Sequence, residues 1–436
     1  MSWLREEIAM KWRTEGKRYA SEINEYVRVG MESNWEQAQQ EPGDDQRSGM
    51  AADIVDMIRA ANQAGDTERL RQEIPPASWP ITPDYEEKQQ AIKPIVCLND
   101  GTVLVRTYGG GIYLIQQDRR ITELPDFYHI GCSSDGNYFA LSNEQGIRII
   151  RGNVTSLGEG EEIAAWSWQV IQQRIKAILN DCESLADSEH PASHIEEAIP
   201  FDNGSRLLLV TDCGIYLLSQ DQVELLHPEL TEMQQFDYED THIDMVHGAV
   251  SADGRWLAYG SQCSEHLLRD AASGKVYTFE PQSSYPHYAL FAKDSSEVWY
   301  NACHFYNGAT IQVPLADLGQ LELEAGTEHE WPLMNDEMRV YAAAALTDGH
   351  ILGDAYGYLR KIDSEGNEKW RYFVGSTLSG IVVSPDESRL AVGTYGGMLH
   401  LIDLQSGVKS EYSIGTANII EIDRWILWRD EELLRW

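Results

Sequence analysis

One supersecondary unit recurs along the last three quarters of the chain, and no other feature constrains the fold as strongly. Each copy has a polar turn, a short apolar run, a reversal that usually contains glycine, and a second apolar run. Repetition of this kind sets the fold, so function has to lie on the edges of the repeats and in the insertions between them. The turns that open the seven copies begin at Asp100, Asp135, Asn203, Asp253, Asp294, Asp348 and Asp386.

Each copy predicts four antiparallel strands. Asp-Gly and Asn-Gly pairs open tight turns because these residues adopt positive φ at little cost. The run that follows is apolar at successive positions, as in residues 207–210, which is typical of a strand buried on both faces. Glycines such as Gly396 mark the next reversal, and a second turn such as residues 406–408 leads to an outermost strand. Four antiparallel strands repeated radially form the blades of a β-propeller.

The spacing of the turns favours seven blades within residues 81–436 and leaves eight possible. Typical blades occupy roughly 40–50 residues, so the longer interval from Asp135 to Asn203 must contain an insertion. Two or three more strands are expected after Asn418. They either close the ring by pairing with a strand from residues 88–97 or form most of an eighth blade, because an open ring would expose unpaired edges. The predicted class is therefore an all-β propeller with helical additions.

Residues 1–80 predict a separate α-helical region that ends in a Pro-rich linker. Apolar residues at intervals of three, four or seven from Leu4 to Tyr26 form one stripe of an amphipathic helix. A second helix is expected over about residues 46–63, and a short third helix follows Gly65. We expect this region to cap the ring. A partner-binding or dimerising arm is the alternative.

A helix inserted at about residues 160–190 fills the long interval between two repeats. Its apolar residues recur at alternating spacings of three and four, and they form a heptad-like seam. A lone helix of this kind must bury its seam, and we expect it to dock on the N-terminal helices. The alternative is a partner's helix, for which the candidate contact residues are Trp168, Ile171 and Ile175.

Three segments resemble the repeats of known propeller families. Residues 359–370 resemble the repeat of quinoprotein-like (PQQ-like) propellers, in which a strand ending in Asp, a Gly turn and a Trp recur. Residues 384–397 and 251–260 are similar to WD-repeat or lactonase-type blades. The resemblance covers about residues 92–436 and implies the fold. It implies no cofactor, because the sequence lacks the adjacent cysteine pair and the calcium-ligand pattern of quinone-dependent dehydrogenases.

Acidic residues dominate the charge of the chain: 70 Asp and Glu stand against 34 Lys and Arg, and the net charge is −36. Such a surface repels nucleic acid and anionic membranes and attracts a basic protein, although ordinary solubility is the other explanation. No apolar run is long enough to span a membrane. The first residues are charged and the six cysteines occur singly, so we expect a cytoplasmic protein with free thiols.

The densest polar patch spans residues 236–247 and offers two kinds of site. Its acidic residues Asp237, Glu239 and Asp240 are the candidate contacts for a basic partner. The sequence has no Gly-x-Ser-x-Gly elbow, phosphate-binding loop or His-Glu-x-x-His motif, so we assign no catalytic residue and no cofactor. Alternatively, imidazole and carboxylate groups suit zinc or iron. The candidate ligands for such a metal are His247, His287, His304 and Asp244.

These features predict a non-enzymatic protein that binds another protein through a rigid acidic ring. Its most concrete form is a bacterial immunity or inhibitor protein that neutralises a basic partner such as a toxin. The alternative is a propeller enzyme, a hydrolase or a lyase, that uses the histidine-rich blades around the central channel. Stoichiometric transition metal in the purified protein would favour the enzyme.

Overall fold

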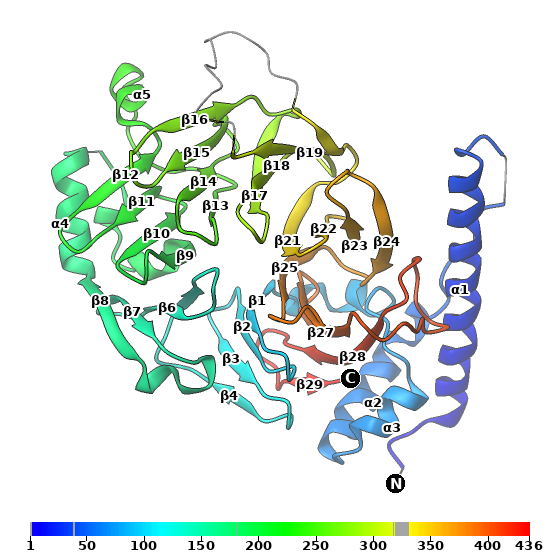
Figure 1. The fold of residues 1–436 in the computed structure, drawn as a ribbon. Helices are drawn as coiled ribbons and strands as arrows, with labels where there is room; N and C mark the ends of the chain where they lie inside the picture. The colour runs from blue at the N-terminus through cyan, green and yellow to red at the C-terminus, as the bar shows by residue number, and fades with distance from the viewer. Residues whose placement is uncertain (1, 38–39, 181, 317, 319–330) are drawn as a thin grey trace.

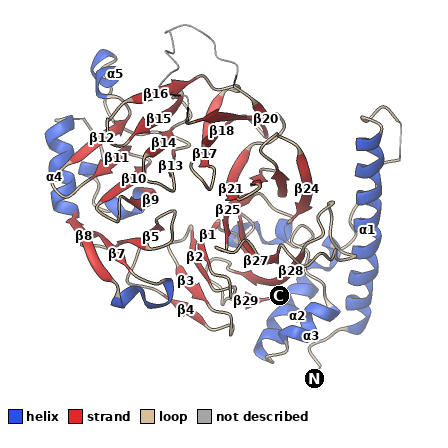
Figure 2. Cartoon of the chain, viewed as in Figure 1, coloured by secondary structure: helices blue, strands red, loops and turns tan. Residues whose placement is uncertain are grey.

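Seven antiparallel sheets surround a central axis, one sheet for each repeat of the sequence (Figure 1). They are seen in a computed structural model that describes residues 2–37, 40–180, 182–316, 318 and 331–436. Figure 2 shows that strands make up the ring and that the helices lie around it. The prediction of a seven-bladed β-propeller is confirmed. The eighth blade is not found among the described residues, because the last two strands extend the seventh sheet.

In each blade the strands follow one another in chain order from the axis to the rim. Blades 1 to 3 consist of β1 (Ile92–Cys97), β2 (Val103–Thr107), β3 (Ile112–Ile115) and β4 (Ile121–Glu123); β5 (His129–Cys132), β6 (Tyr138–Ser142), β7 (Gly146–Arg151) and β8 (Glu161–Ser167); and β9 (Ile195–Phe201), β10 (Arg206–Thr211), β11 (Gly214–Leu218) and β12 (Val223–His227).

The remaining blades follow the same plan, and blade 7 has a fifth strand at the rim. Blades 4 to 7 consist of β13 (His247–Val250), β14 (Trp256–Gly260), β15 (His266–Asp270) and β16 (Val276–Phe279); β17 (Tyr285–Phe291), β18 (Glu297–His304), β19 (Asn307–Pro314) and β20 (Leu333–Asn335); β21 (Val340–Leu346), β22 (Gly349–Asp354), β23 (Tyr358–Ile362) and β24 (Glu368–Phe373); and β25 (Leu378–Val383), β26 (Arg389–Thr394), β27 (Met398–Asp403), β28 (Ile420–Ile426) and β29 (Leu434–Arg435).

The second strand of a blade is apolar on both faces because it lies between two neighbouring sheets. On β10, Leu207 and Leu209 belong to a buried cluster shared with blade 2. Leu208 and Val210 belong to a buried cluster shared with blade 4. The uninterrupted apolar run in the sequence therefore reflects two buried faces of one strand.

The ring closes because the inner strand of blade 1 packs against blade 7. The Ser379 hydroxyl of β25 donates to the Ile92 carbonyl oxygen of β1 at 2.6 Å. A Cβ atom at Gly393 of β26 would lie 1.8 Å from the same oxygen. A glycine at this position therefore lets the two backbones approach closely enough to close the ring.

The C-terminal strands do not complete blade 1, so the predicted pairing with residues 88–97 is wrong. β1 pairs with β2, whereas β28 pairs with β27 and β29 pairs with β28. One backbone hydrogen bond, from the Arg429 amide to the Lys88 carbonyl oxygen at 2.8 Å, joins the two regions. Blade 7 takes all its strands from residues 378–435, which leaves the ends of the ring to meet through side-chain packing.

The N-terminal helices cover the outer strands of blade 7, as expected for a cap on the ring (Figure 1). Trp12 and Trp436 meet there with ring centroids 6.1 Å apart. Their indole N–H groups donate to the carbonyl oxygens of Pro75 and Ile74 at 2.8 and 2.7 Å. The elements of this region are α1 (Glu6–Glu32), η1 (Ser48–Met50), α2 (Ala51–Gln63), α3 (Thr67–Glu73) and η2 (Thr82–Lys88).

The inserted helix α4 (Trp168–Leu179) docks on blades 2 and 3, so its predicted packing on the N-terminal helices is wrong. The helix follows β8 directly, and the Trp168 indole N–H donates to the Asn143 carbonyl oxygen at 2.8 Å. Because the connection to β8 is so short, the apolar side of α4 packs on the blades next to it. The other short helices are η3 (Val154–Glu159), η4 (Leu185–Asp187), η5 (Pro191–His194) and α5 (Leu230–Gln235).

Candidate functional site

The innermost strands all begin at one end of the propeller, and the loops at that end form the candidate site. We call this end the loop face. Because neighbouring strands are antiparallel, the loops between second and third strands and the connections between blades both lie there. The loops of this face are residues 108–111, 124–128, 143–145, 182–194, 212–213, 228–246, 261–265, 280–284, 305–306, 336–339, 355–357, 374–377, 395–397 and 427–433.

Exposed aromatic side chains gather on the loop face. Tyr306 and Tyr356, from blades 5 and 6, have ring centroids 5.7 Å apart, so the aromatic surface crosses from one blade to the next. Contiguous exposed apolar surface of this kind marks interaction sites. From residue 92 onward, all exposed aromatic side chains of the described residues lie on this face: Tyr108, Tyr128, Phe236, Tyr238, Tyr285, Phe305, Tyr306, Tyr356 and Tyr395.

Charge on the loop face is almost entirely acidic. Apart from Arg429, Arg339 is the single Lys or Arg in the sequence of these loops. Its guanidinium lies 4.7 Å from the Tyr341 ring and donates to the Phe305 carbonyl oxygen at 3.0 Å. The acidic residues of these loops are Asp126, Glu144, Glu183, Asp187, Glu189, Asp212, Glu229, Glu232, Asp237, Glu239, Asp240, Asp244, Glu265, Glu280, Asp336, Glu337, Asp430, Glu431 and Glu432.

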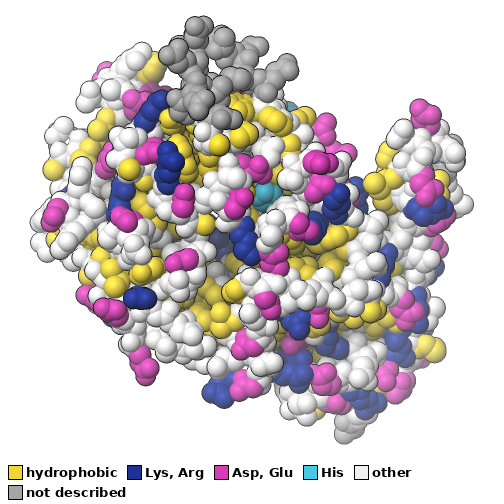
Figure 3. Space-filling view, in the orientation of Figure 1, with side chains coloured by type: hydrophobic (Ala, Val, Ile, Leu, Met, Phe, Trp, Pro, Cys, Tyr) yellow, Lys and Arg dark blue, Asp and Glu magenta, His cyan; other side chains and the backbone are white. Residues whose placement is uncertain are grey.

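Basic residues are common in the turns at the opposite end of the propeller. Arg119, Arg120, Arg255, Lys275 and Lys293 lie there. Both signs of charge, with hydrophobic side chains between them, are visible on the side of the ring drawn in Figure 3. The excess of acidic residues is therefore distributed unevenly, and the loop face has the fewest compensating cations.

The acidic loop predicted from the sequence, Asp237, Glu239 and Asp240, lies on the loop face between α5 and β13. All three side chains are exposed. On either side of Asp237, the exposed rings of Phe236 and Tyr238 stack with centroids 6.4 Å apart. The structure thus presents alternating carboxylates and aromatic rings on one loop.

Backbone hydrogen bonds hold this acidic loop against the insertion. The Glu183 amide donates to the Glu239 carbonyl oxygen at 3.0 Å, and the Thr241 amide donates to the Glu183 carbonyl oxygen at 3.0 Å. The Thr241 hydroxyl also donates to the Cys213 carbonyl oxygen at 2.8 Å. The loop is fixed through its backbone, which leaves its charged side chains free to face solvent.

The apolar residues predicted to contact a partner's helix lie inside the protein instead. Trp168 is 6% exposed, and Ile171 and Ile175 are fully buried in the cluster that α4 shares with blades 2 and 3. The periodicity identified the buried side of the helix correctly. Because the chain itself covers that side, these three residues offer no contact surface.

The four residues of the alternative metal site do not come together as a group of ligands in the described part of the chain. His247 and His287 begin or lie within inner strands, and burial lowers their pKa values to about 4 and about 3. His304 is exposed beside the Ser284 hydroxyl, 3.1 Å away. Asp244 is exposed and accepts from Gln262 at 2.9 Å.

A different cluster of metal-ligating groups lies at the edge of the loop face. Among the described residues, His194, Asp212 and Cys213 have ligand atoms within 4.8 Å of one another. The sequence analysis missed this group because His194 belongs to the insertion and the other two residues belong to the turn between β10 and β11. The repeat pattern of the sequence predicts the turn between β10 and β11. No periodicity, however, indicates that the end of the insertion lies beside this turn.

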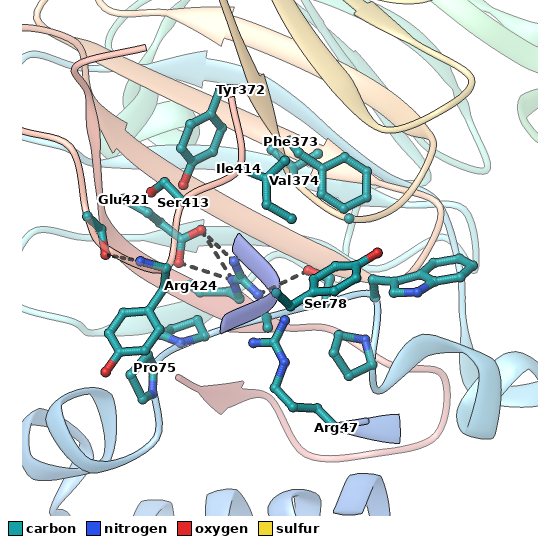
Figure 4. A pocket seen from close by; sticks show the side chains of 18 of the residues that line it. Arg47, Pro75, Ser78, Tyr372, Phe373, Val374, Ser413, Ile414, Glu421 and Arg424 are labelled. Carbon is teal, nitrogen blue, oxygen red and sulfur yellow. Dashed lines mark hydrogen bonds and ion pairs between the residues drawn. The ribbon is translucent and has the colours of Figure 1, made fainter. Parts of the chain in front are cut away.

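A cavity of about 370 Å³ separates the N-terminal linker from the outer strands of blades 6 and 7. Figure 4 shows Arg424 between Glu421, 2.7 Å away, and the Ser78 hydroxyl, 3.0 Å away. Burial alone would raise the pKa of Glu421, but Arg424 and His400 hold it well below its ordinary value. Arg47 pairs with Asp45 at 2.7 Å. These charges compensate one another, so the cavity is a weaker candidate than the loop face.

Comparisons with known proteins identify no family. No model of a known protein family matches the sequence, and no curated protein matches it. Among solved structures, the chain is similar to the β-propeller domain of Cps50 (Swd1) from Myceliophteria thermophila. The identity is 12%, the match covers 76% of this chain and 96% of that chain, and the TM-score is 0.46. In the described part of the chain, no helix is long and apolar enough to cross a membrane.

Proposed function

We propose that this protein is a non-enzymatic, cytoplasmic β-propeller that binds a basic segment of another protein on its loop face. The observation that carries the proposal is the composition of that face. Exposed aromatic rings and carboxylates lie side by side there, and Arg339 and Arg429 are the two basic residues in the sequence of its loops.

This combination suits a Lys- or Arg-rich partner for two physical reasons. A cation over an aromatic ring is attracted by the negative face of the ring, and a carboxylate beside the ring accepts charge-assisted hydrogen bonds from the same cation. Phe236 and Tyr238, which alternate with Asp237, Glu239 and Asp240, offer both kinds of contact. Aromatic residues also contribute most often to the binding energy of protein interfaces.

The most specific form of the proposal is an immunity or inhibitor protein that neutralises a basic toxin. The net charge of −36 supports a strongly basic partner, since opposite fields steer two proteins together. The same charge disfavours nucleic acid as the ligand. The histidines that would serve the alternative enzyme do not form a ligand group in the described residues.

A peptide-binding experiment tests the proposal with a defined probe. The probe is a fluorescent dodecapeptide of alternating Arg and Tyr, and its affinity is measured by anisotropy at low and at physiological salt. Replacing Asp237, Glu239 and Asp240 together by Ala should weaken binding several-fold, mainly by slowing association. The effect should shrink as salt rises, because charges are screened within about 8–10 Å near physiological ionic strength.

A matched triple variant separates local recognition from net charge. Glu159, Asp221 and Glu365 are exposed in turns at the opposite end of the propeller. Replacing them by Ala changes the total charge by the same amount and should leave binding unchanged. Equal losses in both triple variants, or no loss in either, would contradict binding at the loop face.

A further inference from the structure

Three ligating side chains meet where the insertion returns to blade 3. His194 ends η5, whereas Asp212 and Cys213 form the turn between β10 and β11. The His194 Nδ1 atom lies 2.7 Å from Asp212 Oδ1 and 3.4 Å from Cys213 Sγ. His194 and Asp212 are partly exposed, at 29% and 41% of their side-chain surface, so an ion can reach this point from solvent.

A second contact fixes the orientation of the imidazole ring. The His194 Nε2 atom lies 3.0 Å from the Ser188 hydroxyl oxygen. With the Nε2 proton donated to Ser188, the lone pair of Nδ1 faces the carboxylate and the sulfur. Metal-binding histidines are oriented in this way, by a hydrogen bond from the nitrogen that does not bind the metal.

The geometry and the donor types fit a borderline dication. Nitrogen, carboxylate oxygen and thiolate sulfur are all ligands of zinc, which prefers a tetrahedral arrangement. Bonds of about 2.0–2.1 Å to nitrogen and about 2.3 Å to sulfur place those two atoms roughly 3.5 Å apart in a tetrahedron. The distance from His194 Nδ1 to Cys213 Sγ is 3.4 Å. The Asp212 oxygen has only to move outward by roughly half an ångström to complete three corners.

Carboxylates surround the cluster, and the nearby cations have partners of their own: Arg106 donates to the Ile195 carbonyl oxygen at 3.2 Å, and Lys176 pairs with Asp187 at 2.9 Å. The carboxylates of Asp240 and Glu183 lie near Cys213 in addition to that of Asp212. No Lys or Arg occurs in residues 180–194, 212–213 or 228–246. A bound dication would offset this concentration of negative charge.

We propose that His194, Asp212 and Cys213 bind one transition-metal dication of the Zn²⁺ type, with water in the fourth position. On binding, the Cys213 thiol gives up its proton to solvent and its sulfur forms the metal bond. The ion joins the insertion to blade 3. Through Glu183 and Thr241 it also braces the acidic loop of the loop face. The site stands independently of the proposed partner.

Cobalt substitution tests the site directly. The purified full-length chain, stripped with EDTA, is titrated with Co²⁺ and followed by absorption. One equivalent should produce a sulfur-to-cobalt charge-transfer band in the near ultraviolet, and Zn²⁺ should remove the band. Cys213→Ser should abolish the band, and His194→Gln or Asp212→Asn should weaken binding at least tenfold. Cys263→Ser, which changes an exposed cysteine in another loop of the same face, is the matched control and should keep the band.

A second measurement uses the wild-type chain, so its result does not depend on whether the variants fold. Zn²⁺ should protect Cys213 from alkylation by iodoacetamide while Cys263 stays reactive, as read by peptide mass spectrometry. A missing thiolate band in the wild-type chain would overturn the proposal. A band that persists in Cys213→Ser, or equal alkylation of Cys213 with and without Zn²⁺, would also overturn it.

Discussion

His350 provides a direct test of how the stability of this ring depends on pH. It lies on β22 with 2% of its surface exposed, and neither of its ring nitrogens has a hydrogen-bond partner among the described residues. Its ring centroid is 4.0 Å from that of Trp299 in the neighbouring blade. Burial lowers its pKa to about 4, so the folded protein holds this imidazole neutral at pH values where an exposed histidine takes up a proton.

The sign and size of the effect follow from the two pKa values. The unfolded chain has the ordinary pKa of about 6.5, and below that pH it binds more protons at this position than the folded chain. The free energy of unfolding is therefore undiminished above pH 6.5 and falls as the pH is lowered from about 6.5 towards 4. Between pH 7.5 and pH 5.5, His350 alone should remove about 1 kcal/mol.

Urea denaturation of two proteins isolates this contribution. The wild-type chain and His350→Leu are unfolded at pH 7.5, 6.5 and 5.5. The other buried histidines affect both proteins equally, so the loss of stability between pH 7.5 and 5.5 should be about 1 kcal/mol smaller in the variant. Identical losses in the two proteins, or a nuclear magnetic resonance titration of His350 with a midpoint near 6.5, would refute the reasoning.

Two further predictions concern the cap on blade 7. Trp428→Ala should reduce the free energy of unfolding by about 3–5 kcal/mol, because the 3%-exposed side chain packs between the N-terminal helices and blade 7. Trp35→Ala, at an exposed position, is its control in urea denaturation, and a loss under about 1 kcal/mol at Trp428 would contradict its burial. Removal of residues 1–74 should uncover Leu434 and Trp436, so the shortened protein should bind the dye ANS and associate in light scattering. A monomer that binds no more dye than the full chain would show that the helices do not cover that surface.

The seven-bladed ring could be predicted from the sequence because each blade is a local unit. The turn at Asn203 and the apolar run at residues 207–210 lie within one blade, and the two buried faces of β10 explain the run completely. The seam of α4 was equally clear, and Ile171 and Ile175 are fully buried. A seam, however, indicates which side of a helix is buried and not which surface buries it.

The candidate sites depend on long-range arrangement and were predictable only in part. Asp237, Glu239 and Asp240 could be found because they lie together in sequence on an exposed loop. The contacts of His194 with Asp212 and Cys213 join residues 18 and 19 positions apart across the end of an insertion. Neither periodicity nor motif spacing indicates that the end of the insertion lies beside the turn between β10 and β11. The sequence therefore favoured other histidines as metal ligands, and these do not come together in the structure.

The contact between the N-terminal helices and the last strand has a consequence for synthesis of the chain. The side-chain amide of Asn62 donates to the Arg435 carbonyl oxygen and accepts from the Arg435 amide, at 2.8 and 2.9 Å, across 373 residues of sequence. At roughly 5–20 residues per second on the ribosome, the helices wait roughly 20–75 s for that strand. During that time, the apolar faces that blade 7 later covers stay open on the nascent chain, where a chaperone can bind them.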